Sequence, residues 1–429
     1  MKINSSHIDN SQIDNSQLDN LQFEDYLCNF VFSENKLQKR TFVEERKIEG
    51  KNVRFFINEF WTSRQRQASS IHEISYRACF KPQLPAFFIN KLTSEGDIVF
   101  DPFSGRGTTV IEAALRGRTG YANDVNPLSE VLAEPRVNPP KMNEIETRLD
   151  SIQFDKKRDA EIDLSMFYHR DTLGEIVSLR DYLQRRNEEG KEDKTDKWIR
   201  MVATNRLTGH SKGFFSVYTL PPNQAVSQSR QIKINERRMQ TPEYRDVKKI
   251  ILKKSKQLLS RISHTELRNL ERFGKRARFF SSDARDLRYI EDEIVQLTVT
   301  SPPFLDVVQY SNDNWLRCWF NCIDDKEISK RITVVRTLSA WEDVMRGVFR
   351  ELYRITKEGG WVAFEVGEIR SGKIKLEEKI VPIGVNAGFE CAGVVINVQE
   401  FTKTAKIWGV DNNLKGTNTN RIVIFRKGY

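Results

Sequence analysis

Residues 98–109 read Ile98-Val99-Phe100-Asp101-Pro102-Phe103-Ser104-Gly105-Arg106-Gly107-Thr108-Thr109, and residues 110–115 continue with an apolar pattern of helical spacing. The apolar residues at the start predict a buried strand, and the two glycines predict a tight turn before a helix begins. In an α/β sheet this combination is typical of the place where a nucleotide-like ligand binds. Gly105 and Gly107 would let the backbone approach such a ligand closely, and a carboxylate at Asp101 suits a cationic or hydroxyl-bearing ligand. An ordinary strand-to-helix turn is the alternative interpretation.

A second informative stretch lies about two hundred residues further along the chain. Residues 297–300 predict another buried strand, which runs into Ser301-Pro302-Pro303-Phe304. Two consecutive prolines fix the backbone and remove two N–H donors, so carbonyl oxygens remain available beside a hydroxyl and an aromatic ring. A plain loop would also accommodate Pro-Pro, but the two stretches together are more specific than either alone.

Together the two stretches resemble the motifs of the S-adenosylmethionine-dependent DNA amino-methyltransferases, which methylate N4 of cytosine or N6 of adenine. Residues 101–109 resemble the cofactor motif of that family. Residues 300–304 resemble its catalytic motif, in the form more often associated with N4 of cytosine. The resemblance covers roughly residues 70–138 and 278–427. It implies an α/β fold with a Rossmann-like methyltransferase sheet, an antiparallel hairpin at the C-terminal edge, and an inserted, mainly helical basic domain.

The resemblance also implies roles for individual residues. Asp124 ends a predicted second strand 17 residues after Gly107, where a carboxylate would hold both ribose hydroxyls of an adenosyl ligand. Asp283 ends a predicted third strand and would accept a hydrogen bond from the adenine amino group. A segment before the glycine motif would cover the methionine end of the cofactor. The expected cofactor-binding residues are Phe80, Lys81, Pro82, Asp101, Pro102, Phe103, Gly105, Gly107, Thr108, Thr109, Asp124 and Asp283.

The second motif suits methyl transfer to an exocyclic amine, whose lone pair is delocalised into the base. A hydroxyl at Ser301 and the carbonyl of Pro302 could each accept one N–H and aim the lone pair, while Pro303 holds the turn rigid and Phe304 stacks on the base. The base must leave the duplex to reach such a site. Methylation of a ring carbon would instead need a cysteine nucleophile, and the sequence contains no Pro-Cys pair.

The positive charge of the chain is concentrated in its centre. The net charge is +10 over 429 residues, and residues 197–256 contain 14 Lys and Arg against 3 Asp and Glu. This pattern favours a polyanion-binding module; a soluble basic surface, a structural lid or an oligomerisation arm are the alternatives. Helices are predicted at 142–163, 172–190, 195–206 and 242–272. The expected DNA-binding residues are Lys212, Arg230, Lys233, Arg237 and Arg238.

We therefore expect four segments along the chain. Residues 1–22 would be a mobile tail, and residues 23–140 would hold an N-terminal arm and the first half of the catalytic domain. Residues 141–277 would form the inserted DNA-recognition region, and residues 278–429 the second half of the catalytic domain. The insert falls between the second and third predicted strands, earlier than expected for the family arrangement in which target recognition separates the two motifs.

Other features of the sequence narrow the class of protein. The sequence contains no run of eighteen apolar residues, so no membrane span is predicted. The N-terminus lacks a hydrophobic signal region. The five cysteines form no CxxC pair, so we expect reduced thiols, no metal site and a cytoplasmic, nucleoid-associated protein.

The function expected from the sequence is site-specific methylation of cytosine N4 in double-stranded DNA. Such an enzyme would belong with restriction-modification or phage defence, with a cognate restriction endonuclease as a candidate partner. Methylation of adenine N6 is the close alternative. An RNA amino-methyltransferase and a non-catalytic DNA-binding regulator are the further alternatives, and the oligomeric state stays open.

Overall fold

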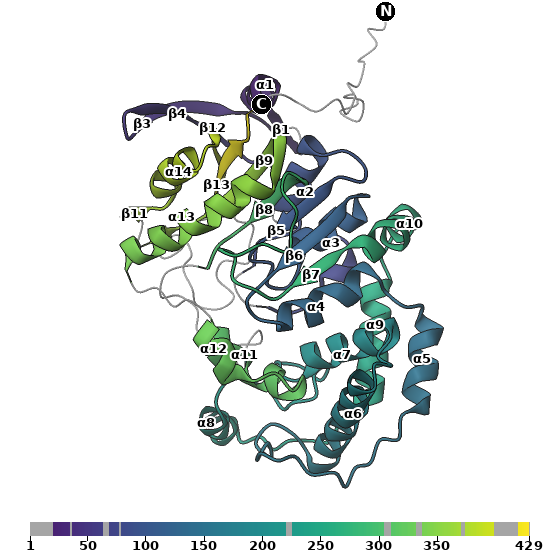
Figure 1. Ribbon diagram of the computed structural model, residues 1–429. Coiled ribbons are helices and arrows are strands. Elements are labelled where there is room, and N and C mark those ends of the chain that lie inside the picture. The colour runs from purple at the N-terminus through teal and green to yellow at the C-terminus, as the bar shows by residue number, and fades with distance from the viewer. Residues whose placement is uncertain are drawn as a thin grey trace, which may run out of the picture.

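The computed structural model describes residues 20–34, 37–62, 68–76, 79–219, 225–303, 310–331, 337–369, 374–398 and 419–428. A large sheet with flanking helices forms one region, and a cluster of helices lies beside it (Figure 1). Phe304 and residues 1–19 of the predicted tail lie outside the described residues. Helix α1 (Asn20–Asn29) begins just before the predicted end of that tail. Within the described part, no helix is both long and apolar enough to cross a membrane.

The main sheet has nine strands in the order β3-β4-β12-β13-β9-β8-β5-β6-β7. Strands β9, β8, β5, β6 and β7 run parallel, and β13 is antiparallel to both β9 and β12. The strands are β3 (Phe42–Ile48), β4 (Lys51–Asn58), β5 (Ile98–Asp101), β6 (Thr119–Asn123), β7 (Arg278–Phe280), β8 (Val295–Thr300), β9 (Thr356–Val366), β12 (Glu390–Val398) and β13 (Thr419–Arg426). The predicted Rossmann-like α/β fold is confirmed.

The C-terminal hairpin β12–β13 is antiparallel as predicted, but it does not form the edge of the sheet. Strand β4 pairs in parallel with β12, with Phe55 opposite Val394, and β3 pairs with β4 outside it. The prediction of an edge hairpin was therefore wrong on this point. Strands β3 and β4 belong to the predicted N-terminal arm, so the pairing of β4 shows that this arm extends the sheet.

The sheet is buried on both faces, which explains why its central strands read as nearly continuous apolar runs. Helices α13 (Leu338–Ile355) and α14 (Glu377–Asn386) pack on one face, against residues such as Phe100 and Phe364. Helices α1 and α2 (Gln83–Leu92) pack on the other, against Val99 and Val299. Adjacent residues of one strand contribute to opposite faces, as the period of two requires.

The inserted helices lie between β6 and β7. They are α5 (Met142–Ser151), α6 (Arg170–Glu188), α7 (Lys194–Arg206), α8 (Gln228–Arg238), α9 (Val247–Leu259) and α10 (His264–Phe273). All of them except α10 contribute to one hydrophobic cluster, whereas Leu270 of α10 lies in a different cluster with Val110 and Ile111. The helix predicted at 142–163 ends twelve residues early. The long helix predicted at 242–272 is two helices, because Ser263 and Glu266 form a capping box that starts α10.

Helix α11 (Tyr310–Phe320) belongs by its packing to this helical core, although it follows β8 in the sequence. Its fully buried Leu316 and Phe320 lie in the same hydrophobic cluster as Trp198 and Phe167. The sequence-based division assigned residues 278–429 to the catalytic half, and it did not predict this return of the chain. The helical region therefore consists of the insert and of a second, separate segment.

Candidate cofactor and catalytic site

The two sequence motifs meet at the carboxyl edge of the sheet, where the strand order reverses. From β5 the chain continues to β6 and β7 on one side, and it later returns to β8 and β9 on the other side (Figure 1). In open α/β sheets, ligands bind outside the carboxyl ends of the strands at such a switch point. Asp101 ends β5, Asp124 follows β6 and Ser301 follows β8.

The glycine turn is tied to the acidic residue after the second strand. The N–H of Gly105 donates to Oδ2 of Asp124 at 2.9 Å, and the N–H of Asn126 donates to its Oδ1 at 2.9 Å. Each oxygen of a carboxylate can accept more than one hydrogen bond, so both retain capacity for the two hydroxyls of a ribose. Burial raises the pKa of Asp124, and the two backbone N–H groups lower it. The donor set therefore fits an adenosyl cofactor.

The two glycines have different roles. Gly105 has φ +52°, and the nearest atom to a side chain added there would be in Tyr76, at 3.5 Å. Gly107 has φ +79°, and an added Cβ would lie 2.3 Å from Cβ of Ala133. Gly107 thus permits the close packing of α3 (Thr108–Leu115) against α4 (Leu128–Val137). Close approach of the backbone to a ligand, predicted for both glycines, remains a proposal for Gly105.

Asp101 connects the cofactor motif to the catalytic motif. Its side chain is 1% exposed, and its Oδ1 accepts hydrogen bonds from Oγ1 of Thr300 at 2.6 Å and from the N–H of Phe103 at 3.1 Å. Burial raises the pKa of Asp101 to about 7, although these hydrogen bonds oppose the shift. A buried carboxyl that titrates near neutral pH at a strand end is typical of a functional site.

The other predicted cofactor residues lie around this turn. Pro102 and the two threonines Thr108 and Thr109 are buried, and Phe103 is half-buried. Thr109 Oγ1 donates to the carbonyl of Val299 at 3.0 Å, which fixes the start of α3 against β8.

The structure differs from the sequence expectation at Asp283. Strand β7 ends at Phe280, and Asp283 lies in the following loop, where Arg285 donates to both of its oxygens, at 2.9 and 2.5 Å. This guanidinium lowers the pKa of Asp283. The side chain that joins the loops after β5 and β7 is Asn123, which donates to the carbonyls of Pro102 and Ser282. Asp283 would have to release Arg285 before it could accept from an adenine amino group.

The segment that leads to Phe80, Lys81 and Pro82 is held by buried arginines. Arg106 donates to the carbonyl of Ile74 at 3.1 Å, and Arg317 of α11 donates to the carbonyl of Ser75 at 3.1 Å. Phe80 packs against the core beneath α2, Lys81 is exposed and Pro82 is buried. The segment thus passes between the sheet region and the helical region before it reaches α2.

The catalytic motif has a buried acidic neighbour that the sequence analysis missed. The Ser301 hydroxyl is hydrogen-bonded to the carboxyl of Glu365, near the end of β9. The carbonyl of Pro303 accepts from Nε1 of Trp341 at 3.3 Å, which anchors the turn, and Pro302 is buried. An acid near the end of an apolar strand, at 361–366, was the available signal for Glu365, as it was for Asp101.

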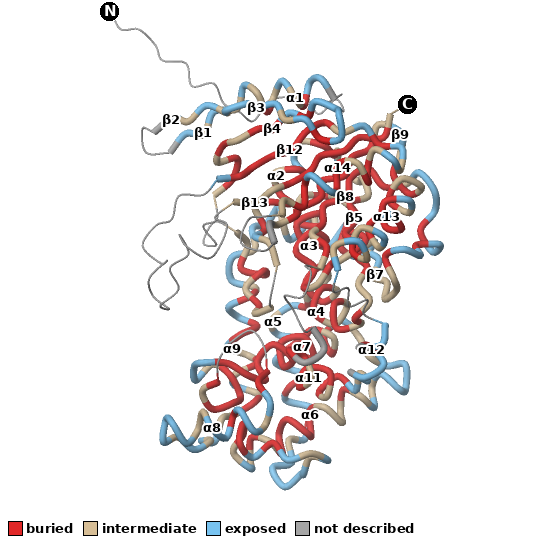
Figure 2. The backbone as a smooth tube through the Cα atoms, turned by 90° about the vertical axis from the view of Figure 1, so that its left-hand side faces the viewer, coloured by how far each residue is buried: buried red, intermediate tan, exposed pale blue. Residues whose placement is uncertain are grey.

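The predicted DNA-binding residues are exposed, and four of them lie on α8, which is on the far side of the helical region from the sheet (Figure 2). Arg230, Lys233 and Arg237 lie on α8, and within the described residues none of them forms an ion pair. Arg238 stacks on the ring of Tyr218, with its guanidinium 3.7 Å from the ring centre. Many other cations of this region are paired with acids, for example Arg158 with Asp181, Arg180 with Glu161 and Arg200 with Glu192. Lys212 is exposed in the loop after α7.

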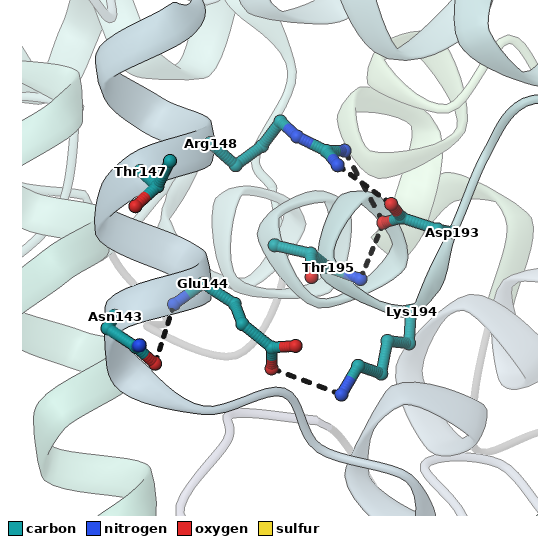
Figure 3. A pocket seen from close by; sticks show the side chains of 7 residues that line it. All are labelled: Asn143, Glu144, Thr147, Arg148, Asp193, Lys194 and Thr195. Carbon is teal, nitrogen blue, oxygen red and sulfur yellow. Dashed lines mark hydrogen bonds and ion pairs between the residues drawn. The ribbon is translucent and has the colours of Figure 1, made fainter.

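A polar hollow of about 370 Å³ lies between α5 and the start of α7, outside the motif site (Figure 3). Its polar side chains pair with one another: Arg148 with Asp193 at 2.7 Å, and Lys194 with Glu144 at 3.1 Å. None of the predicted site residues lines it. The lining residues are Asn143, Glu144, Thr147, Arg148, Asp193, Lys194 and Thr195.

Comparison with known proteins agrees with this arrangement. A family model for DNA methylases matches residues 11–161. The type II methyltransferase M.MvaI of Kocuria varians is 22% identical over 255 residues, which are 54% of this chain and 52% of that protein. M.MjaII of Methanocaldococcus jannaschii, also a type II methyltransferase, is 29% identical over 106 residues, 23% of this chain and 20% of that protein. The chain thus spans about half the length of the first relative and a fifth of the second.

Among solved structures, TrmN from Thermus thermophilus aligns with 85% of this chain and 53% of its own, at 13% identity and a TM-score of 0.32. The family match and the type II relatives agree with the resemblance seen in the two motifs. Residues 11–161 match the DNA methylase family model, and the chain is similar over parts of its length to type II methyltransferases, in agreement with an S-adenosylmethionine-dependent DNA amino-methyltransferase.

Proposed function

We propose that this protein transfers the methyl group of S-adenosylmethionine to the exocyclic N4 of cytosine in a specific sequence of double-stranded DNA. One observation carries the proposal: Thr300, which precedes Ser301, donates to Asp101 of the cofactor motif at 2.6 Å. Two motifs 199 residues apart thereby share one hydrogen bond at the strand edge, which supports a single site for donor and acceptor. Methylation of adenine N6 is the alternative product.

The residues of the chain would bind and orient the two reactants. When bound, the cofactor supplies an electrophilic methyl group on a sulfonium. Asp124 would hold the ribose hydroxyls, and Phe80, Lys81 and Pro82 would cover the methionine end. Ser301 Oγ and the Pro302 carbonyl would each accept an N–H of a flipped-out base, so that the nitrogen lone pair points at the methyl carbon.

The choice of cytosine rests on Ser301. The Ser-Pro-Pro-Phe form of the motif is the one more often associated with methylation of N4 of cytosine. Mass spectrometry of nucleosides from unmethylated DNA, incubated with the pure protein and S-adenosylmethionine, tests the proposal. N4-methylcytosine is the expected product. N6-methyladenine would instead assign adenine as the target base. If the protein binds the cofactor but forms no modified nucleoside, the proposed function is contradicted.

The proposed association with restriction-modification or phage defence rests on the similarity to type II methyltransferases.

Cofactor affinity is expected to increase as the pH rises through about 7. Burial raises the pKa of Asp101 to about 7, so its carboxyl is neutral below that pH and attracts a sulfonium only above it. If the bound cation lowers this pKa by one unit, affinity changes about tenfold across the titration. Calorimetry from pH 6 to 8 would measure this dependence. Asp101→Asn should abolish it, and S-adenosylhomocysteine, whose sulfur carries no charge, should show less of it; equal slopes for both ligands would exclude an effect of the sulfonium charge.

We propose that α8 binds DNA phosphates. Gln231 and Asn235, one turn apart, face inward and donate to the carbonyls of Tyr218 and Met166 at 3.1 and 2.7 Å. These amides fix the helix, and its cations are directed to solvent. Because those cations lack acidic partners in the described part of the chain, they are available to polyanions.

Reversing Lys233 and Arg237 to glutamate should therefore weaken DNA binding and lower the slope of log K against log salt by about 2, since each phosphate contact contributes about 0.9. Fluorescence anisotropy at several salt concentrations would measure this. The double reversal of Arg158 and Lys191 is a matched control, because it changes the net charge equally at cations that pair with acids. If both double variants lower the slope equally, α8 is not a specific contact.

A further inference from the structure

Met239 follows α8 in a backbone conformation that side chains rarely adopt. Its φ of +48° and ψ of +47° lie in the left-handed region, where a Cβ comes too close to the following carbonyl oxygen and a glycine or an asparagine usually ends a helix. The N–H of Met239 donates to the carbonyl of Glu236 at 3.1 Å, and the N–H of Gln240 donates to the carbonyl of Asn235 at 3.1 Å. A methionine at this position therefore costs folding free energy that a glycine would not.

The side chain of Met239 makes no packing contact that would offset this cost. It is 94% exposed, more than the other large apolar side chains in the described ranges. The residues on either side are fixed, because Arg238 stacks on the ring of Tyr218 at 3.7 Å and Nε2 of Gln240 donates to the carbonyl of Tyr218 at 3.0 Å. The methionine thus projects into solvent from a turn that is anchored on both sides. Backbone strain of this kind is typical of functional positions.

A row of cations leads along α8 to this methionine. Arg230, Lys233 and Arg237 follow one another at intervals of three and four residues, so they line one face of the helix. They lack acidic partners in the described part of the chain and attract a polyanion. The apolar side chain at the end of the row suits the stacked bases of DNA better than its phosphates. A symmetric contact between two copies of the chain would instead bring two like-charged rows together, which is unfavourable.

We propose, on the basis of the function proposed above, that Met239 is an apolar wedge that inserts between the bases of DNA bound along α8. Proteins that bend DNA commonly unstack a base step with an inserted apolar side chain, and methionine is among the residues that they use. The phosphate contacts of α8 hold the duplex against the helix, and the anchored turn directs Met239 into it.

The place of α8 in the molecule says where the wedge acts. Helix α8 lies on the far side of the helical region from the sheet (Figure 2). The unstacked step is therefore not at the base that is methylated, and Met239 does not fill the space which that base leaves. Steps that unstack easily, such as pyrimidine–purine steps, are favoured at this second position. The wedge thereby contributes to the choice of target without a hydrogen bond to a base.

Met239→Gly separates this proposal from a structural role. Glycine relieves the left-handed strain, so the variant should melt at the wild-type temperature or above it. Its DNA affinity should nevertheless fall about tenfold, the loss expected when one apolar side chain is no longer buried. The slope of log K against log salt should not change, because no phosphate contact is lost. Fluorescence anisotropy with S-adenosylhomocysteine bound, together with thermal unfolding, measures these quantities.

Two further variants serve as controls. Met239→Leu keeps an apolar side chain of similar volume and should retain most of the affinity. Leu267→Ala is the matched control, because it removes another exposed apolar side chain, on α10, and should bind DNA like the wild type. An equal loss in Leu267→Ala and Met239→Gly would overturn the inference.

The fluorescence of 2-aminopurine, an adenine analogue that brightens when it is unstacked, locates the wedge. Duplexes that contain the methylated site carry the analogue at successive positions. The wild type should brighten a position other than the target base, and Met239→Gly should lose this signal. If only the target position brightens, or if Met239→Gly binds DNA like the wild type, this inference is overturned while the proposed function stands.

Other outcomes have a different meaning. If the cofactor-bound wild type methylates no base, the proposed function fails, and the inference fails with it. If Met239→Gly keeps its DNA affinity but changes its oligomeric state in light scattering, the side chain belongs to a contact between copies of the chain, and the wedge is excluded.

Discussion

Ser301→Ala is expected to lower kcat about 10²- to 10³-fold, the usual cost of removing one preorganised polar group from a reaction site. The hydroxyl is the group at the end of β8 that could accept an N–H of the target amine while it donates to Glu365. Removal of the hydroxyl leaves the amine with one acceptor and its lone pair poorly aimed. Cofactor affinity should not change, because the glycine turn follows the neighbouring strand β5 and Asp124 follows β6, one strand further on.

Single-turnover kinetics and calorimetry on the same preparation would separate these effects. Ser178→Ala is a suitable control, since this buried serine of α6 bonds only within the helical region, to Gly174 and Asp155. Loss of cofactor affinity in Ser301→Ala would mean that the pocket is wrongly assigned. A wild-type rate would exclude Ser301 from the reaction.

Asp124→Asn is expected to weaken cofactor binding roughly 100-fold, which corresponds to about 2.7 kcal/mol and to the loss of charged hydrogen bonds to two hydroxyls. An asparagine keeps the volume, but its NH₂ group would face the N–H of Gly105 or of Asn126, both of which now donate to the carboxylate. The glycine turn should therefore loosen at the same time.

Calorimetric titration with S-adenosylhomocysteine measures this effect without turnover. Asp286→Asn is the matched control, because Asp286 is an acid of a nearby loop that pairs with Arg288. An unchanged affinity in Asp124→Asn would remove Asp124 from the site, and an equal loss in both variants would indicate a general effect of charge.

The meeting of the two motifs could be predicted from the sequence because each is a local pattern. An apolar strand followed by Asp101 or by Ser301 fixes which end of the strand carries the group, and the parallel sheet brings such ends to one edge. Helices α6 and α7 were also predicted closely, at 172–190 and 195–206, since apolar residues at helical spacing need only one face to be buried.

The remaining features depend on contacts that no local pattern contains. The role of Gly107 depends on Ala133, which packs against it from the next helix. The ion pair that occupies the Asp283 carboxylate depends on the rotamer of Arg285. Strand β4 pairs with β12, more than three hundred residues away, and an exposed edge offers its backbone groups to any strand that reaches it. The acid at Glu365 was visible in the sequence, but its relevance depends on the pairing of β9 with β8.

The packing of α11 has a consequence for the redesign of target specificity. The core of the helical region is built from residues of α5 to α9 together with α11, and Leu316 and Phe320 fill part of it. A chimera that exchanges only the insert with a relative would join a foreign core to a native α11 and leave a mismatched interface, which costs a few kcal/mol in a packed core. Exchange of recognition between relatives therefore requires both segments, and evolution must alter them together.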